Sequence, residues 1–350
     1  MFTFNKDRDE CMRKVTLRDV AKEAGVALST ASNALNDSDV VTDSTKEKVM
    51  EAAEKLNYFP NINAKLIKAK KSNRLAFITT SINGDYYEQL LQVVVNTVAV
   101  RGYQLDVIIT ENKDIVLSRM LEGSYDGFII IGQYFLDKKQ MQTIKNNNIA
   151  CVFLDRNYVS ENTSSVLFKS FEAGYDLTKY LINLGHKNIV FVEYSKEHYD
   201  SNERKRGYFK ALDDYGLERD ENLILTGRFD EHLTYSAVLN FMKTQAYKDK
   251  FPTAFICGND RSAIGAMRAL KNLAYEIPRE ISVAGFDNIE LAKYINPSLT
   301  TIKNPISEQG KYAAIALMDM IDKNKSGYLV ELDCELIIRE STGVVNSNFI

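Results

Sequence analysis

The 350-residue sequence has few of the residues that build metal sites and disulfide frameworks. Its four cysteines, Cys11, Cys151, Cys257 and Cys334, lie far apart with no CxxC pair, and its three histidines are scattered. A structural zinc site needs clustered Cys and His, and a disulfide framework needs a cysteine-rich chain. The sequence therefore predicts no metal site and no disulfide, and we expect no cofactor.

Long hydrophobic runs are also missing. No window approaches the roughly 18 uninterrupted apolar residues that a membrane-spanning helix needs. The first residues, MFTFNKDRDE, carry charges where a secretory signal peptide needs an apolar segment. We therefore expect a cytoplasmic protein with no membrane partner. Its 45% hydrophobic and 26% charged residues are ordinary for a globular chain, and its length suits two or three domains.

The signatures of common enzyme classes are absent as well. There is no GxGxxG after the first apolar segment, no GxxxxGK[ST], no GxSxG and no HExxH. His186, in LGHKNIVFV, is typical of a junction between a helix and a strand. These absences favour a binding protein over an enzyme, with an enzyme on an α/β scaffold as the alternative.

Charge is distributed unevenly along the chain. Residues 12–71 hold eleven Lys and Arg against eight Asp and Glu, a net charge of +3, whereas the whole chain carries −3. A small basic head joined to an acidic body indicates that only the head meets a polyanion.

Three short helices are predicted in the head. Thr16 can cap the first, with Asp19 in its first turn, and Gly25 suits a left-handed residue just past its end. The second helix is expected over Leu28–Leu35 and the third over 43–57. The residues expected inside this head are Leu17, Val20, Ala21, Ala24, Ala31, Ala34, Leu35, Val49, Ala52, Ala53 and Leu56. Three short helices with a glycine turn between the first two are the pattern of a helix-turn-helix DNA reader, and an ordinary three-helix bundle is the alternative.

From Arg74 onward, short apolar segments alternate with amphipathic ones. The expected strands are 75–80, 104–109, 127–131, 150–154, 188–192, 223–226, 254–257 and 281–286. Continuous apolar runs such as FIII and IVFV are typical of parallel strands buried on both faces. The body is therefore predicted as a doubly wound α/β structure, whose two halves fit two lobes with a cleft between them.

The strings themselves resemble a known family. VTLRDVAKEAGVALSTASNALN and EKVMEAAEKLNYFPN closely resemble the DNA-binding head of the lactose/galactose-repressor family of bacterial transcription regulators. Four strings of the body resemble the effector-binding core of that family, which is similar to periplasmic sugar-binding proteins; they are YLINLGHKNIVFV, RKRGYFKALDDYGL, PTAFICGNDRSAIGAMRALKNLAYEIPREISVAGFDN and PSLTTIKNPISEQGKYAA.

The resemblance implies three parts of the chain. They are an all-α helix-turn-helix DNA-binding domain at 13–59, a hinge helix and linker at 60–73, and a core of two lobes with doubly wound parallel sheets at 74–345, which binds the effector and dimerises. Residues 1–11 resemble nothing in the family, and we expect that they lie upstream of the natural start, since Met12 stands just before the segment that does.

The resemblance also implies DNA contacts. The helix Leu28–Leu35 would lie in the major groove, with Leu28 and Ser29 setting operator sequence. Asn33 stands where the family usually has an Arg that reads guanine. Contact with phosphates, or support for it, is implied for Thr16, Thr30, Ser32, Asn36 and Tyr58. Short hydroxyl and amide side chains suit phosphate oxygens and fix register, while contacts with base edges specify sequence.

The hinge is implied to fold into a short helix only on operator DNA, paired with its copy in a dimer partner. Ile67 would be the apolar wedge that enters the minor groove and kinks the duplex, with Lys68 as its basic neighbour. A plain solvated linker is the alternative for this segment.

Two residues of the head depart from the family pattern. Ala27 replaces the Ser that usually caps the recognition helix, and losing such a cap typically costs about 1 kcal/mol. Asn33 cannot make the paired contact of Arg with guanine and is better matched to adenine. The operator is therefore expected to differ from the usual half-site at that base pair.

Six effector contacts are implied for the body. Arg204 would grip effector oxygens, Asn259 and Asp287 would pair with hydroxyls, Tyr86 and Phe229 would pack on the ligand face, and Asp155 would add a polar contact. Such a set suits a sugar or sugar phosphate. The alternatives are a turn cap for Asp287, a core position for Phe229 and a surface ion pair for Arg204.

One departure concerns the ligand. Phe168-Lys169 stands where the family often has Asp-Asn. Lys169 then either favours an acidic or phosphorylated sugar or points to solvent.

These expectations describe a homodimeric repressor of carbohydrate-utilisation genes. It binds double-stranded operator DNA and is released by a small-molecule effector, a sugar or sugar phosphate. The alternatives are a regulator that needs a corepressor or a phosphorylated carrier protein, and a sugar-binding receptor without a DNA role.

Overall fold

The computed structural model describes residues 15–58, 71–132, 136–195, 198–244, 247 and 250–346. The chain divides into two compact units, Met1–Lys71 and Ser72–Ile350. Among the described residues, no helix has the length and hydrophobicity that a membrane span requires. In the same part of the chain, no three Cys, His, Asp or Glu side chains gather as a metal site would need.

Where the structure describes it, at residues 15–58, the first unit contains three helices, α1 (Leu17–Glu23), α2 (Leu28–Leu35) and α3 (Asp43–Lys55). Gly25 turns the chain between α1 and α2 with a φ of 65°, a conformation that glycine adopts without strain. Small side chains fill the core of this unit: Val20, Ala21, Ala31, Ala34, Val41, Val49, Ala52 and Ala53. The expected core residues Leu17, Ala24, Leu35 and Leu56 are only partly buried at its edge.

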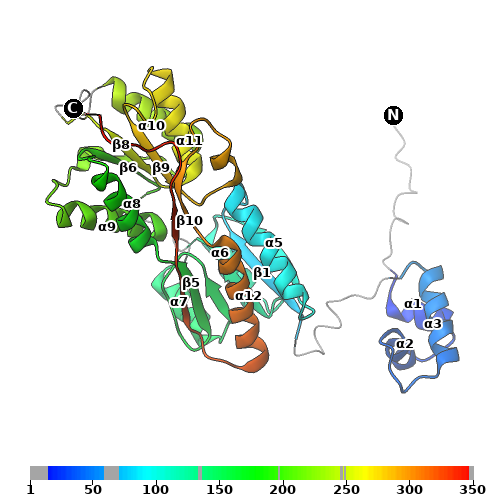
Figure 1. Ribbon diagram of the computed structural model, residues 1–350. Coiled ribbons are helices and arrows are strands. Elements are labelled where there is room, and N and C mark those ends of the chain that lie inside the picture. The colour runs from blue at the N-terminus through cyan, green and yellow to red at the C-terminus, as the bar shows by residue number, and fades with distance from the viewer. Residues whose placement is uncertain are drawn as a thin grey trace, which may run out of the picture. The chain divides into compact units, whose positions relative to one another are not determined.

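The second unit consists of two α/β lobes (Figure 1). The sheet of the first lobe has the order β11-β5-β4-β3-β1-β2, with all strands parallel. Its strands are β1 (Arg74–Thr79), β2 (Gln104–Ile109), β3 (Gly127–Ile130), β4 (Cys151–Phe153), β5 (Thr163–Phe168) and β11 (Leu329–Leu332). Its helices are α5 (Asp85–Ala99), α6 (Lys113–Leu121), α7 (Lys138–Asn146) and α12 (Ile306–Lys323).

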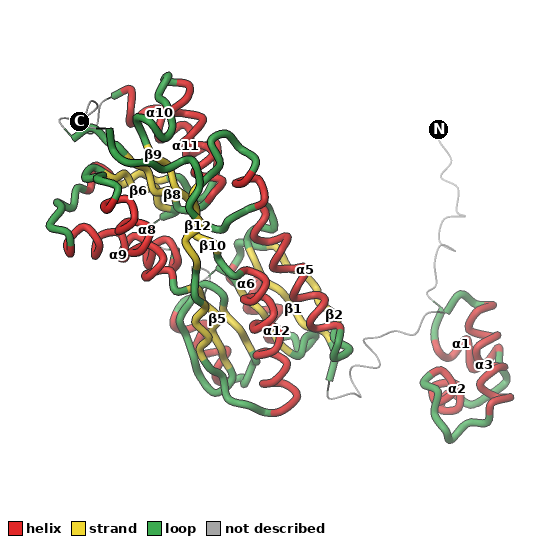
Figure 2. Tube along the Cα trace, viewed as in Figure 1, coloured by secondary structure: helices red, strands yellow, loops and turns green. Residues whose placement is uncertain are grey.

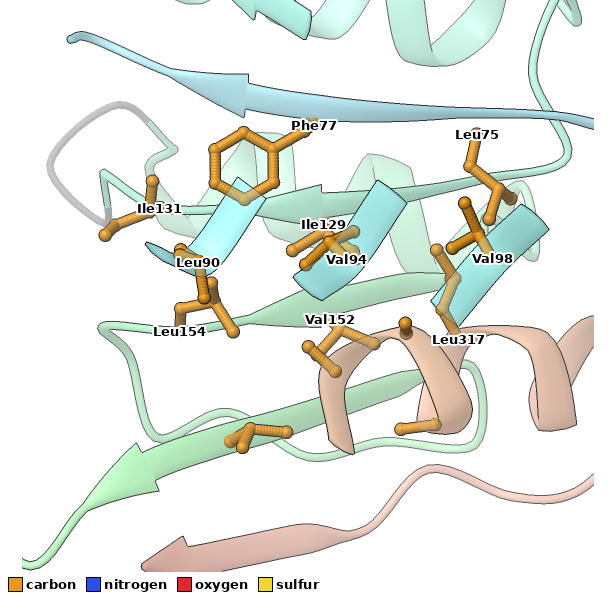
Figure 3. Packing of buried hydrophobic residues seen from close by; sticks show 14 of the residues in the cluster. Leu75, Phe77, Leu90, Val94, Val98, Ile129, Ile131, Val152, Leu154 and Leu317 are labelled. Carbon is orange, nitrogen blue, oxygen red and sulfur yellow. The ribbon is translucent and has the colours of Figure 1, made fainter. Parts of the chain in front are cut away.

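Helices cover both faces of this first sheet. Leu90 and Val94 of α5 and Leu317 of α12 pack on one face against Phe77 and Ile129 of the strands (Figure 3). Helices α6 and α7 pack on the other face through Val116, Met120, Met141 and Ile144. Strand β3 is buried along its whole length, as its unbroken apolar run predicts.

The second lobe repeats this plan. Its sheet has the order β12-β10-β9-β8-β6-β7, parallel except for β12. Its strands are β6 (Ile189–Glu193), β7 (Ile224–Thr226), β8 (Ala254–Cys257), β9 (Ser282–Phe286), β10 (Thr300–Lys303) and β12 (Glu335–Ile337). Helices α8 (Ser170–Asn183) and α9 (Tyr199–Asp214) cover one face and α10 (Glu231–Lys243) and α11 (Asp260–Asn272) the other, with 3-10 turns at Glu221–Leu223 and Glu290–Lys293.

In the described part of the body, the chain crosses between the lobes three times, as Figure 2 shows. The crossings join β5 to α8, β10 to α12 and β11 to β12. In each sheet the strand order reverses direction beside the first strand, between β1 and β3 and between β6 and β8. Open α/β sheets bind ligands at the carboxyl ends of strands at such points, so we expect a ligand site where these strand ends of the two lobes face each other.

The prediction of doubly wound lobes is confirmed, and the eight expected strands are present with ends that differ by at most one residue. Four strands were not expected: β5, β10, β11 and β12. Their segments, TSSVLF, TTIK, LVEL and ELI, are short or rich in polar residues. They form strands because of their neighbours: β5 and β10 extend the parallel sheets, and β11 and β12 cover their edges.

Candidate DNA-binding surface and ligand cavity

The exposed face of α2 carries the side chains expected to read DNA. Ala31 and Ala34 turn inward, whereas Leu28 is 42% exposed and Ser29 and Asn33 are exposed. Because residues four apart share one face of a helix, Ser29 and Asn33 lie together on the surface. Thr30 and Ser32 are partly buried beside them. This is the arrangement that insertion of α2 into a groove requires.

The ends of the head helices hold the other expected phosphate contacts. The Thr16 backbone N–H and hydroxyl both donate to the Asp19 carboxylate, at 2.9 and 2.6 Å, which fixes the start of α1. The Asn36 amide donates to the Ser32 carbonyl at 2.8 Å, and Tyr58 packs at the edge of the head core. Ile67 and Lys68, the expected wedge and its neighbour, lie outside the described residues.

Ala27 occupies the cap position of α2 with a φ of −68° and a ψ of 152°, and it makes no side-chain cap bond. Backbone N–H groups in the first turn of a helix have no partner inside the helix. The departure noted in the sequence therefore leaves α2 without the hydroxyl that would satisfy one of them.

A cavity of about 390 Å³ lies between the lobes of the body. It is lined by residues that follow strands of both sheets, such as Gly132 after β3, Asp155 after β4, Tyr194 after β6 and Asp287 after β9. All six residues expected to contact an effector are in its lining: Tyr86, Asp155, Arg204, Phe229, Asn259 and Asp287. The fold thus brings together side chains that lie up to about two hundred positions apart in the sequence, and their contact with a ligand stays a prediction.

Arg204 is the most deeply buried cation of this lining, with 3% of its surface exposed. Its guanidinium lies 4.4 Å from the ring centre of Phe286 and 5.7 Å from that of Phe229. One N–H donates to the Gly258 carbonyl at 2.5 Å, while the buried Nε has no hydrogen-bond partner. The surface ion pair considered as an alternative is wrong, because this side chain is inside the molecule.

Asn259 and Asp287 also serve the local structure. The Asn259 side chain accepts from Ser262 N at 2.9 Å, which caps α11, and its amide donates to the Phe229 carbonyl at 3.3 Å. Asp287 has a φ of 102° and accepts from the Asn304 amide at 2.7 Å. Burial raises the pKa of Asp287, while nearby Arg204 and the bond from Asn304 oppose that rise.

Asp155 and Tyr86 belong to the first lobe. Asp155 is 2% exposed and accepts from Gly132 N at 2.5 Å. The Tyr86 hydroxyl donates to the Gln309 side chain on α12 at 2.8 Å. Burial raises the pKa of Tyr86. Both side chains are therefore fixed before any ligand enters.

Lys169 does not line the cavity. Its ammonium group pairs with Asp333 at 2.6 Å, linking two of the three crossings between the lobes. Phe168 does line the cavity. Of the two interpretations of Lys169, the one that gives it a role in ligand binding is wrong.

Three features of the cavity were missed in the sequence. His198, at the start of α9, packs against Tyr194 and Phe229 with ring centres 4.7 and 5.0 Å away, and burial lowers its pKa to about 4. Arg228 lines the cavity directly before Phe229. Asp85 of α5 and Arg261 of α11 form an ion pair at 3.0 Å that joins the two lobes. Only the rule that loops after parallel strands carry ligand contacts could have indicated Arg228.

The comparisons with known proteins agree with this arrangement. The family model for bacterial regulatory proteins of the lacI family matches residues 16–61, and the model for a periplasmic binding protein-like domain matches 178–342. The HTH-type transcriptional repressor PurR of Vibrio vulnificus is 31% identical over 95% of this chain and 99% of its own length. The probable HTH-type transcriptional repressor ExuR of Bacillus subtilis is 32% identical over 93% of this chain and 98% of its own.

A solved structure shows the same fold. The lac repressor dimer bound to operator and the anti-inducer ONPF superposes with a TM-score of 0.77 at 24% identity, covering 95% of this chain and all of that one. The relatives named above are repressors, and the expectation that this chain is a regulator agrees with them. The chain belongs to the lacI family of bacterial regulatory proteins and is a DNA-binding transcriptional regulator.

Proposed function

We propose that the protein is a dimeric repressor of carbohydrate-utilisation genes that leaves its operator when a sugar occupies the cavity between the lobes. One observation carries the proposal. The cavity combines aromatic rings, Phe168, Tyr194 and Phe229, with fixed carboxylates, an amide and a buried arginine. Aromatic faces cover the C–H surface of a sugar while polar groups pair with its hydroxyls.

Release follows from the position of the cavity. A ligand held by both lobes stabilises one arrangement of them over another, and it changes DNA affinity only if that arrangement binds operator differently. In this proposal two copies of the chain place two α2 helices on paired half-sites, and Ile67 and Lys68 hold the minor groove between them. Such a regulator works in the cytoplasm, where bacterial DNA lies.

The test begins with the operator. Full-length protein selects duplexes from a random library, and the bound site is expected to be two-fold symmetric, with adenine opposite Asn33. Binding to a labelled copy of that site should weaken steeply with salt, because phosphate contacts release counterions. A Ser29→Ala, Asn33→Ala double variant, changed only at exposed positions, should lose the preference for this site and keep the affinity for random DNA.

The second step titrates sugars against the labelled complex. Release by a sugar supports the proposal. Tighter binding would mean that the ligand is a corepressor, and a response that needs a phosphorylated carrier protein would place control in that partner. If the protein shows no salt-sensitive preference for one duplex over random DNA, the proposed repressor function is wrong. A sugar-binding receptor without a DNA role would then be the better interpretation.

A further inference from the structure

Most of the charged side chains that line the cavity already pair with other groups of the protein, but some of the arginines do not. Five aspartates are present in the lining, and each already has a partner within the protein. The pairings are Asp85 with Arg261, Asp155 with Gly132 N, Asp200 with Ser170, Asp230 with Leu233 N, and Asp287 with Asn304. The acids therefore serve first to hold the cavity in shape.

The arginines of the lining are less fully used. Arg261 pairs with Asp85, but Arg204 keeps its Nε without a partner although the side chain is 97% buried. The Arg228 side chain has no hydrogen bond and no ion pair among the residues that the structure describes, and it is exposed at the cavity. No lysine belongs to the described lining, and burial of His198 lowers its pKa to about 4, so that ring is neutral at pH 7.

The backbone holds Arg228 at this place. Gly227 N donates to the Glu193 carbonyl at 2.8 Å and Arg228 N to the same oxygen at 3.3 Å, which ties the turn after β7 to the end of β6. Arg228 and Phe229 both adopt the left-handed region, with φ of 52° and 56°. Such conformations cost free energy for side chains other than glycine, and in proteins they cluster at ligand-binding sites.

The surroundings of this turn suit a sugar ring. Phe229 packs against Tyr194 and His198, with both ring centres 5.0 Å away, so an aromatic surface lies next to the arginine in the chain. The Arg204 guanidinium also lies near Phe229, 5.7 Å from its ring centre. A ligand that stacks on this surface would therefore present its substituents to two guanidinium groups.

We propose that the effector is an anionic carbohydrate, whose carboxylate or phosphate pairs with Arg228 while Arg204 donates to the ring oxygens. The guanidinium fork matches both anions with two parallel N–H bonds, which a neutral hydroxyl cannot use. The inference rests on the proposed function, because it takes the cavity as the effector site. It differs from the expectation for Lys169, which lies outside the cavity.

Probes that share one ring test this choice. D-glucose, D-glucuronate and glucose 6-phosphate differ only at C6, and D-galactose, D-galacturonate and galactose 6-phosphate form a second set. Calorimetric titration into the full-length protein should show that an anionic member of one set binds at least tenfold more tightly than its neutral member. Comparison of the affinities for the uronate and for the sugar 6-phosphate shows whether the site prefers a carboxylate or a phosphate.

Variants then assign the effect to the residue. Arg228→Gln should weaken binding of the anionic sugar about tenfold to a hundredfold, the usual range for a hydrogen bond to a charged group, and leave the neutral sugar unchanged. Arg228→Lys should restore part of the difference. Arg279→Gln, at an exposed arginine of the same lobe whose ion pair is with Glu276 outside the cavity, is the matched control and should change neither.

Three results would overturn the proposal. They are binding of a neutral sugar as tight as that of its anionic partner, binding of none of the four anionic sugars, and an anionic preference that survives Arg228→Gln. The proposed function is judged separately by the DNA assay. If a neutral sugar releases the operator, the proposed repressor function is supported and the proposal of an anionic effector is overturned.

Discussion

The two units of the chain place their functional side chains in opposite ways. In the head, the buried hydrophobic residues are all Val and Ala, and Ser29 and Asn33 stand on the surface. In the body, large rings such as Phe77 and Phe286 are fully buried, and Arg204, a predicted effector contact, is buried with them. The side chains predicted to contact DNA are therefore on a surface, whereas those predicted to contact the effector line an enclosed cavity.

This difference has an energetic consequence. Few apolar groups hold the head together, so small changes at its surface and caps matter to its stability. The body has two cores in each lobe, one on either face of each sheet. Because the chain divides into two compact units with separate cores, each unit is expected to unfold on its own.

The largest expected effects are losses of stability caused by core substitutions, one in the body and one in the head. Phe286→Ala removes a fully buried ring of the second lobe and should lower the free energy of unfolding of the body by about 3–5 kcal/mol. Val49→Ala in the head core should lower that of the head by about 2 kcal/mol, for two methyl groups and the cavity they leave.

Scanning calorimetry of the full-length protein measures both. Each variant should shift only the transition of its own unit, since neither core contains residues of the other. If either substitution moved both transitions by the same amount, the two units would unfold as one cooperative unit.

The head was predictable because its information is local. Helix caps, a glycine turn and apolar spacing lie within about forty residues, and α1 and α2 begin and end where the pattern indicates. The departures of Leu35 and Leu56 reflect the small size of this unit, whose core cannot cover every apolar side chain.

The cavity was predictable only in part. Arg204, Asn259 and Asp287 stand in strings that resemble the family. Arg228 does not, and nothing local distinguishes it from any exposed arginine in a loop. The ion pair of Asp85 with Arg261 joins residues 176 positions apart, and β11 pairs with β5 across 164 positions. Such contacts are set by topology, which a single sequence does not reveal through spacing.

A smaller effect is expected at the start of α2, where the head lacks a cap. Ala27→Thr should stabilise the head by about 1 kcal/mol relative to Ala27→Val, because the two side chains have the same shape and only Thr supplies an oxygen to the first turn. Thermal unfolding of both full-length variants measures the difference. Equal melting temperatures would show that α2 is held by packing alone, and the contrast between a lightly held head and a deeply packed body would weaken.

The smallest effect concerns the contact between the lobes. The side chains of Asp85 and Arg261 are 24% and 41% exposed, so their ion pair is screened by water and is worth about 0.5 kcal/mol. Asp85→Asn should therefore weaken effector binding only about twofold, if the pair stabilises the same closed arrangement of the lobes that the ligand needs. Arg261→Gln should do the same, and the double variant should be no weaker than either, since a broken pair cannot be broken again. Fully additive losses in this double-mutant cycle would mean that each side chain contacts the ligand separately. The two residues of the cavity would then act independently, as the exposed side chains of the head are expected to do.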